Sequence, residues 1–425
     1  MKLNNIKIRN FRGCQDVQLD FDKNMTVIVG ANGSGKSTIL DAISISLSWI
    51  IARVRNIKAQ GLFIADEEIY NGSKAGYIDA QFDGIEKLLI PSKTQKGFSK
   101  EYTSDLKDLN RYCDSIREKI ELTEKKTSLP ILVKYGVRRA VVDIPLRIKK
   151  SHIFDLFEAY ENSLRGDANF RNFFEWYRNQ EDIENENLRE SYNLFNSGNP
   201  NAFHPDKTLE TVRNSIRKFM PAFDGIRVTR NPLQMRIRKN GFSLNVSQLS
   251  DGEKIYMALV GDLCRRLTLA NPTLDDPLQG EGIVLIDELD LHLHPQWQTE
   301  IATKLCETFP NIQFIVTTHS PLVITNVQSS QLRILSSTDG NVNVLRSAGS
   351  YALPVSVILK DVMGITNELP YTIEKVLLPD LYKSIHDGDI DKAKQMCSEL
   401  ESLSPDFPDL VKIRKFIEIK SRSLQ

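Results

Sequence analysis

The sequence lacks the features that mark several large classes of protein. It has only five cysteines, Cys14, Cys113, Cys264, Cys306 and Cys397, and no two of them form a C-x-x-C pair. This scatter argues against a zinc site and against a disulfide framework. No apolar run reaches membrane-spanning length, and the N-terminus has no apolar signal-peptide core. We therefore expect a cytoplasmic protein without a membrane partner.

An excess of charge of either sign is also missing. The chain has 55 basic and 55 acidic residues among 425, so its overall balance does not point to nucleic acid or to an anionic membrane. It contains no internal repeat, no low-complexity tract and no long series of heptads. Its length allows two or three compact units, or one large domain with an insertion.

The stretch Gly30 to Thr38 reads G-A-N-G-S-G-K-S-T, between an apolar run and an amphipathic one. Strand, glycine-rich loop and helix in this order predict a phosphate-binding loop. Its glycines let successive N–H groups point at a phosphate, and the dipole of the following helix adds to the attraction. We expect Lys36 to reach the β- and γ-phosphates and Ser37 to bind Mg²⁺. The predicted nucleotide contacts here are Asn32, Gly33, Ser34, Gly35, Lys36, Ser37 and Thr38.

A second motif is an apolar strand, 282–286, that ends in Asp287 and Glu288. Buried central strands of parallel sheets have this composition, and ligands bind at their carboxyl ends. Asp287 would hold Mg²⁺, and Glu288 would orient or deprotonate the attacking water. The alternative is a strand that merely ends in acidic residues, but the phosphate loop upstream favours the functional interpretation.

Two further motifs are less specific. Ser250 and Glu253 open a helix as a capping box. The functional alternative is that Ser250 and the Gly252 amide bind the γ-phosphate of a nucleotide held by another subunit. His319 follows the apolar strand 312–316 and would hydrogen-bond the γ-phosphate and Glu288, although a histidine there can also be a simple cap.

Taken in order, G-A-N-G-S-G-K-S-T, L-S-D-G-E, D-E-L-D-L-H-L-H-P and T-T-H-S resemble the motifs of the ABC-type ATPases, in the branch of SMC, RecF and OLD proteins. Within it the chain is most similar to the PtuA-type ATPases of the retron-associated Septu anti-phage system. The resemblance covers residues 1–145 and 223–345. It implies ATP and Mg²⁺ as cofactors, and a homodimer or larger oligomer whose ATP sites each use the signature helix of a second subunit. It also implies control of a separate HNH nuclease of the PtuB type.

The resemblance implies an α/β fold: a P-loop ATPase head with a mixed β-sheet flanked by helices. We expect an N-terminal lobe over 1–145 and a helical insertion over 146–222. The C-terminal lobe, 223–345, carries the signature, the acidic strand end and the histidine, and 346–425 is helical. Aromatic residues at helical spacing predict the core of the insertion. These are Phe154, Phe157, Phe170, Phe173, Phe174, Trp176 and Tyr177.

Other interpretations stay open. A DNA-repair clamp of the RecF or SMC type would bind duplex DNA through a local cluster of basic residues. The alternative is that these residues only form a solvent-exposed face of the protein. His292 and His294 are compatible with a metal site, but no cysteine or third histidine lies nearby in sequence. The acidic run 387–391 fits a loop and helix cap better than a nuclease site. No glutamine of a Q-loop is found near Tyr135. The basic cluster comprises Arg213, Arg217, Lys218, Arg227, Arg230, Arg236, Arg238 and Lys239.

Overall fold

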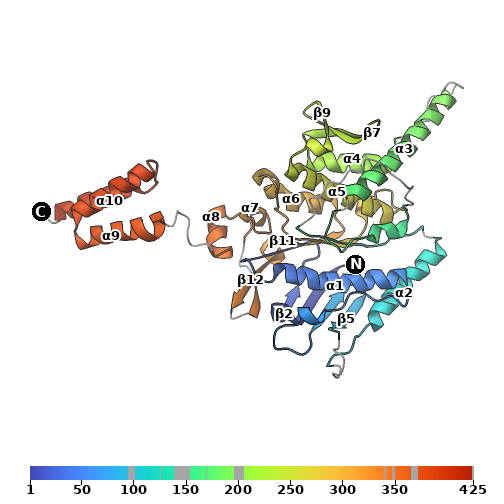
Figure 1. The fold of residues 1–425 in the computed structure, drawn as a ribbon, viewed down its shortest axis with the longest axis horizontal. Coiled ribbons are helices and arrows are strands. Elements are labelled where there is room, and N and C mark those ends of the chain that lie inside the picture. Colours follow the sequence, from blue (N-terminus) through green and yellow to red (C-terminus); the bar gives the residue numbers. More distant parts are fainter. Residues whose placement is uncertain are drawn as a thin grey trace. The chain divides into compact units, whose positions relative to one another are not determined.

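A six-stranded sheet forms the centre of residues 1–358 (Figure 1). In the computed structural model, its strand order is β13-β12-β3-β11-β10-β6, and all neighbours are parallel except β12 and β13. The strands are β3 (Met25–Gly30), β6 (Ile131–Tyr135), β10 (Gly282–Ile286), β11 (Ile312–Thr317), β12 (Leu332–Thr338) and β13 (Asn341–Arg346). The structure describes residues 1–93, 101–124, 126–137, 154–168, 170–195, 205–338, 341–346, 350–364 and 372–423.

Helix α1 (Lys36–Arg55) lies between this sheet and a second, antiparallel one (Figure 1). It contacts β3 and β11 on one side and β1 and β4 on the other. Helix α2 (Lys107–Leu122) packs against α1 and β5. The antiparallel sheet has the order β2-β1-β4-β5 and comprises β1 (Leu3–Phe11), β2 (Cys14–Asp20), β4 (Tyr77–Phe82) and β5 (Ile85–Pro91).

Helix α5 (Asp251–Ala270) packs on the edge strand β6, among the helices on the other side of the central sheet (Figure 1). A small antiparallel sheet, β7-β8-β9, packs there against α3 and α4. The aromatic side chains from Phe170 to Tyr177 are at most 1% exposed, so this part of the predicted core is confirmed. Phe154 and Phe157 are only half-buried, so the prediction does not hold for them. The elements are α3 (Phe170–Phe195), α4 (Lys207–Phe219), α6 (Pro295–Thr308), α7 (Pro321–Ile324), β7 (Phe223–Arg230), β8 (Leu233–Lys239) and β9 (Phe242–Asn245).

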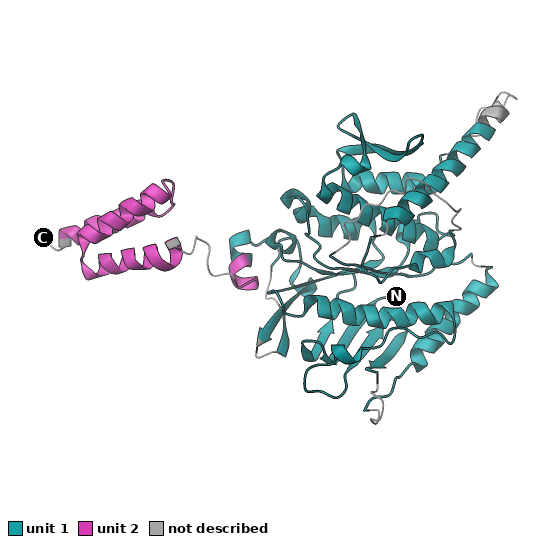
Figure 2. Ribbon diagram, viewed as in Figure 1, with its two compact units in different colours: residues 1–358 teal, residues 359–425 magenta. Residues whose placement is uncertain are grey.

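The chain divides into two compact units, residues 1–358 and 359–425 (Figure 2). The second unit is helical and has a core of its own, in which Leu381, Ala393, Leu400 and Ile413 are fully buried. The expected α/β class with a mixed sheet is confirmed, whereas the four-part division of the chain stays a prediction. The C-terminal elements are α8 (Val355–Val357), π-helical turns at Ile358–Val362 and Thr372–Leu377, α9 (Leu378–Asp387), α10 (Ile390–Leu403) and α11 (Leu410–Ser423).

Helix α1 is long and apolar enough to cross a membrane by length and composition alone, and no other helix of the described residues is. However, 61% of its most apolar window is buried inside the protein. Core helices of globular proteins meet the same criterion, and α1 is packed between two sheets, so we assign it to the core.

Candidate functional site

The loop after β3 has the backbone of a phosphate-binding loop. Gly33 and Gly35 take left-handed conformations, with φ of 79° and 94°, which residues with a side chain adopt at a cost. Gly35 caps α1, and its carbonyl accepts the N–H of Ile39 at 3.0 Å. The first N–H groups of α1 therefore face the loop without partners inside the helix, as an anion requires.

Lys36 lies within the curve of this loop. Its Nζ donates to the carbonyl oxygens of Gly30 and Ala31, at 2.9 and 3.0 Å, and the residue is 7% exposed. Burial lowers the pKa of Lys36, while the carboxylates of Asp287 and Glu288 act in the opposite direction. The ammonium group is thus held beside the acidic end of β10.

A threonine on β11 holds the two acidic residues in place. Thr317 Oγ1 donates to Asp287 Oδ1 at 2.6 Å and accepts the N–H of Glu288 at 2.8 Å. The N–H of Asp287 donates to the carbonyl of Tyr135, on the neighbouring strand, at 2.8 Å. Glu288 has a φ of 49°, in the left-handed region, so the chain turns sharply where β10 ends.

His319 follows β11 and is fixed through its backbone. Its N–H donates to Asp290 Oδ1 at 3.2 Å, and the hydroxyl of Thr318 donates to the same oxygen at 2.6 Å. Asp290 therefore ties the loop after β10 to the end of β11, and the imidazole is half-buried at the same edge of the sheet.

These motifs meet in one cavity of about 460 Å³. Three of its lining residues belong to none of the predicted motifs. Gly13 belongs to the turn after β1, and Ser337 and Val342 lie on β12 and β13, two strands that were not predicted. Nine predicted residues line it: Asn32, Gly33, Gly35, Lys36, Ser37, Thr38, Asp287, Glu288 and His319.

The cavity suits a magnesium nucleotide. Ser37 and Asp287 both line it and offer a hydroxyl and a carboxylate oxygen, the ligand type that Mg²⁺ prefers. Ser34, by contrast, is 2% exposed and does not line the cavity, and within the described residues its hydroxyl has no hydrogen-bond partner.

The signature residues lie outside this cavity. Ser250 and Glu253 form the predicted capping box: Glu253 Oε2 accepts the N–H of Ser250 at 2.9 Å, and Ser250 Oγ accepts that of Glu253 at 3.4 Å. A side chain at Gly252 would come within 2.3 Å of the carbonyl oxygen of His292, so only glycine fits there. The start of α5 is thus packed against the loop that follows Glu288.

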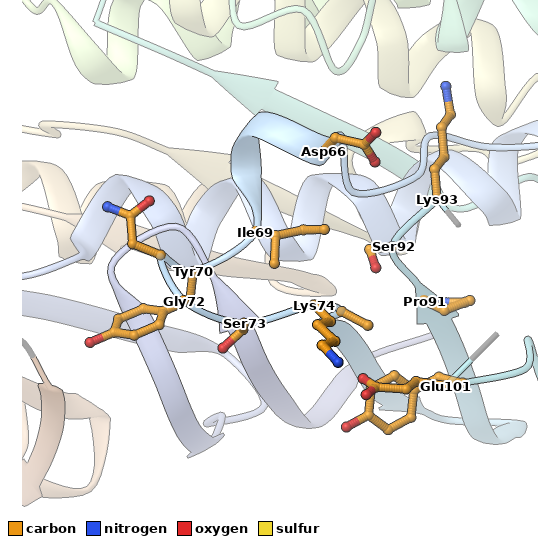
Figure 3. Close-up of a pocket in the computed structure, with 13 residues that line it drawn as sticks. Asp66, Ile69, Tyr70, Gly72, Ser73, Lys74, Pro91, Ser92, Lys93 and Glu101 are labelled. Atoms are coloured by element: carbon orange, nitrogen blue, oxygen red, sulfur yellow. The ribbon is translucent and has the colours of Figure 1, made fainter. Parts of the chain in front are cut away.

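A second cavity, of about 530 Å³, lies in the N-terminal region (Figure 3). Tyr70, Lys74, Lys93 and Glu101 are among its lining residues, and none of the predicted site residues is. Its buried polar side chain, Ser92, accepts the N–H of Gly76 at 3.2 Å and is thereby engaged within the fold. We therefore take the cavity at the phosphate loop as the candidate functional site.

The basic cluster around β7 and β8 is largely neutralised. Arg213 pairs with Glu184, Arg230 with Glu181 and Asp182, Arg238 with Asp224, Lys239 with Glu253 and Lys218 with Glu307. Basic side chains that are paired with carboxylates contribute less to the positive electrostatic potential that would attract DNA. These ion pairs therefore favour the interpretation that the cluster is a solvent-exposed face without a DNA-binding role.

His294 and Asp389, from the remaining histidine and acidic motifs, are helix caps. His294 caps α6, and the described part of the chain holds no group of three or more residues able to bind a metal ion. Asp389 caps α10, and Gly388 ends α9 with a φ of 82°. The prediction of a loop and helix cap at 387–391 is confirmed.

The phosphate loop, the acidic strand end and the histidine on adjacent strands define a P-loop ATPase of the ABC type. The chain belongs to the AAA ATPase domain family, which matches residues 1–324. It is 35% identical to "Retron Ec83 probable ATPase" of Escherichia coli over 79% of this chain and 71% of that protein. For "Retron Vc95 probable ATPase" of Vibrio cholerae serotype O1 biovar El Tor, identity is 34% over 81% and 75%.

Similarity to PtuA is lower but extends over most of the chain. The "Septu protein PtuA" of Bacillus mycoides is 25% identical over 78% of this chain and 40% of that protein. The chain is therefore an ATPase of the SMC, RecF and OLD branch, close to PtuA, and the predicted resemblance is confirmed. Its identity to the two retron proteins is higher than to this PtuA.

Proposed function

We propose that the protein is a defence ATPase that dimerises around two shared ATP sites and controls a separate HNH nuclease. The observation that carries the proposal is that the signature motif lies apart from the other motifs. The cavity unites the phosphate loop with Asp287, Glu288 and His319, whereas Ser250 is exposed outside it, at the start of α5. In a dimer, Ser250 of the second copy would complete the site, so that each site combines the cavity of one copy with the start of α5 of the other. The names of the relatives, retron and Septu proteins, support a defence role.

The residues divide the reaction between them. Lys36 and the N–H groups of the loop would bind the β- and γ-phosphates, and Glu288 would orient the water that attacks the γ-phosphate. His319 would hydrogen-bond that phosphate. Ser37 and Asp287 would hold Mg²⁺, which neutralises phosphate charge when bound. Catalysis then rests on positioning and on charge stabilisation.

The signature helix would complete the site from the second subunit. Ser250 Oγ accepts a hydrogen bond inside its own capping box, so its proton is free to be donated to a phosphate oxygen. The amide of Gly252 lies in the first turn of α5, where N–H groups have no partner within the helix. Both groups therefore suit a γ-phosphate, with Glu253 fixing the turn that carries them.

The test of the shared site is Glu288→Gln. This change keeps the shape of the side chain but removes the base, so ATP should stay bound and a dimer should accumulate. Light scattering at matched protein concentration should give twice the monomer mass with ATP. Lys36→Ala is the control and should give no ATP-dependent increase. A Glu288→Gln protein that binds ATP and stays monomeric contradicts the shared site.

The nuclease partner needs its own experiment. Co-expression with an HNH nuclease encoded beside the ATPase should yield a complex whose DNA cleavage differs between wild-type and Glu288→Gln ATPase. Equal cleavage in both would exclude control by the ATP cycle. We place the complex in the cytoplasm without a membrane partner.

The competing function is a DNA-repair clamp. It predicts salt-dependent binding of duplex DNA by the ATPase alone, lost when Arg236 and Arg238 are reversed to Glu while hydrolysis is kept. Arg236 contacts Ser243 and Arg238 pairs with Asp224, so the structure gives this alternative less support.

A further inference from the structure

We infer that Lys239, at the end of β8, is a positioning residue for the ATP held by a second subunit. The inference rests on the proposed shared site. Lys239 holds the carboxylate of Glu253, and that carboxylate in turn holds the backbone of Ser250, the residue that would face the partner's γ-phosphate.

The link is a short chain of contacts. Lys239 Nζ donates to Glu253 Oε1 at 2.5 Å, and the other oxygen of the same carboxylate accepts the N–H of Ser250 at 2.9 Å. The ammonium also lies 5.4 Å from the centre of the Phe223 ring, which favours a cation. Because Phe223 pairs with Lys239 across β7 and β8, the sheet fixes where the ammonium lies.

Charge and burial make this link strong. Glu253 is 8% exposed, and burial alone would favour its neutral form, yet hydrogen bonds from Lys239 and Ser250 lower its pKa. Without the ammonium group of Lys239, one carboxylate oxygen of Glu253 would lose its hydrogen-bond partner in a largely buried position. The carboxylate would then turn toward water or take up a proton, and its hydrogen bond with the N–H of Ser250 would weaken.

The position of the contact between Lys239 and Glu253 determines which nucleotide site its loss would affect. Neither Lys239 nor Glu253 lines the cavity of its own chain, so their loss leaves the chain's own phosphate loop intact. We expect only the start of α5 to shift, and catalysis is sensitive to such displacements because the reacting groups must be aligned. The defect should therefore appear at the partner's nucleotide.

The first test is Lys239→Met, which keeps an unbranched side chain only one atom shorter and removes the charge. We expect kcat for ATP to fall about tenfold or more, with KM and the affinity for a fluorescent ATP analogue nearly unchanged. Lys239→Arg should restore most of the rate. Arg238→Met is the matched control: it removes a charge from the adjacent residue, whose partner Asp224 lies within the sheet. A normal rate for Lys239→Met would overturn the inference.

The second test separates an effect on the partner from a local one. Lys36→Ala removes phosphate binding in its own subunit but keeps Lys239. Mixed with Lys239→Met, it forms heterodimers in which one site has an intact phosphate loop and an intact signature helix. ATP hydrolysis in the mixture should exceed that of either variant alone. No gain, in mixtures whose exchange of subunits is verified, would mean that Lys239 acts within its own subunit and would overturn the inference.

Two measurements keep the outcomes distinct. If Lys239→Met fails to fold, Glu253→Gln weakens the same link and keeps an oxygen for Ser250, so a wild-type rate there would overturn the inference. If Glu288→Gln stays monomeric with ATP, the shared site fails. If it dimerises and Lys239→Met has the wild-type rate, only the role of Lys239 fails.

Discussion

Gly30 ends β3 in a space that admits no side chain. A Cβ there would lie 2.5 Å from the carbonyl oxygen of Leu335 and 2.6 Å from Ser34 Oγ. We expect Gly30→Ala to destabilise the protein by about 3 kcal/mol, since backbone atoms cannot move aside easily. Gly13→Ala has nothing within 4 Å of its Cβ and should change stability by less than about 0.5 kcal/mol. Urea unfolding measures both, and equal stabilities would contradict the packing.

Burial controls the chemistry of the thiols. It raises the pKa of Cys14 and Cys306 to about 11 and that of Cys113 and Cys264 to about 12. A thiol reacts as its thiolate, so at pH 8 these four should stay protonated and resist maleimide in the folded protein. Mass spectrometry should find them labelled only after denaturation, and rapid labelling of Cys14 in the native state would contradict this.

The site residues were predictable because their motifs are local in sequence. The phosphate loop needs glycine, lysine and serine at fixed spacing, and an acidic strand end needs only Asp287 and Glu288. The role of Thr317, which holds both acidic residues, depends on β10 and β11 being neighbours. The contact of Lys239 with Glu253 depends on a hairpin folding back on α5. Neither of these two contacts can be predicted from the spacing of the residues along the sequence.

At the scale of elements, Asp262 on α5 anchors a fully buried ionic cluster. It accepts hydrogen bonds from Arg265, Arg266 and the hydroxyl of Tyr135. Asp262→Asn would leave two buried guanidinium groups without a counter-charge and should cost about 3–5 kcal/mol of stability. Guanidinium chloride unfolding measures this change.

The matched control for Asp262→Asn is Asp114→Asn on α2. Asp114 is paired with Arg117, but its side chain is 62% exposed, so its loss should cost less than about 1 kcal/mol. If both substitutions cost the same, burial would not be what makes the cluster important.

The helices and strands around the site were mostly predicted from hydrophobic periodicity. The strands β12 and β13 were missed, although an Asp-Gly dipeptide, a frequent hairpin turn, separates them in sequence. Polar and apolar residues alternate only weakly in these strands. On β12, for example, the charged residue Arg333 is buried and donates to the carbonyl of Asp20. The order β3-β11-β10 was also not predictable, because it follows from packing rather than from the order of motifs.

At the scale of the whole molecule, the division into units predicts a separable ATPase. Every residue of the phosphate-loop cavity and all three sheets lie within residues 1–358. The helices α9, α10 and α11 bury Leu381, Leu400 and Ile413 against one another. A chain ending after Gly364 should therefore unfold cooperatively and bind an ATP analogue within about twofold of the full-length affinity. Its control is the same chain with Lys36→Ala, which should not bind.

Two outcomes would contradict this division. Aggregation of the shortened chain would mean that the C-terminal helices cover apolar surface of the first unit. A folded chain without affinity for the analogue would mean that they contribute to the nucleotide site itself. Binding with normal affinity but without ATP-dependent dimerisation would instead assign assembly to the C-terminal helices, because the phosphate loop and the signature helix are both retained in the shortened chain.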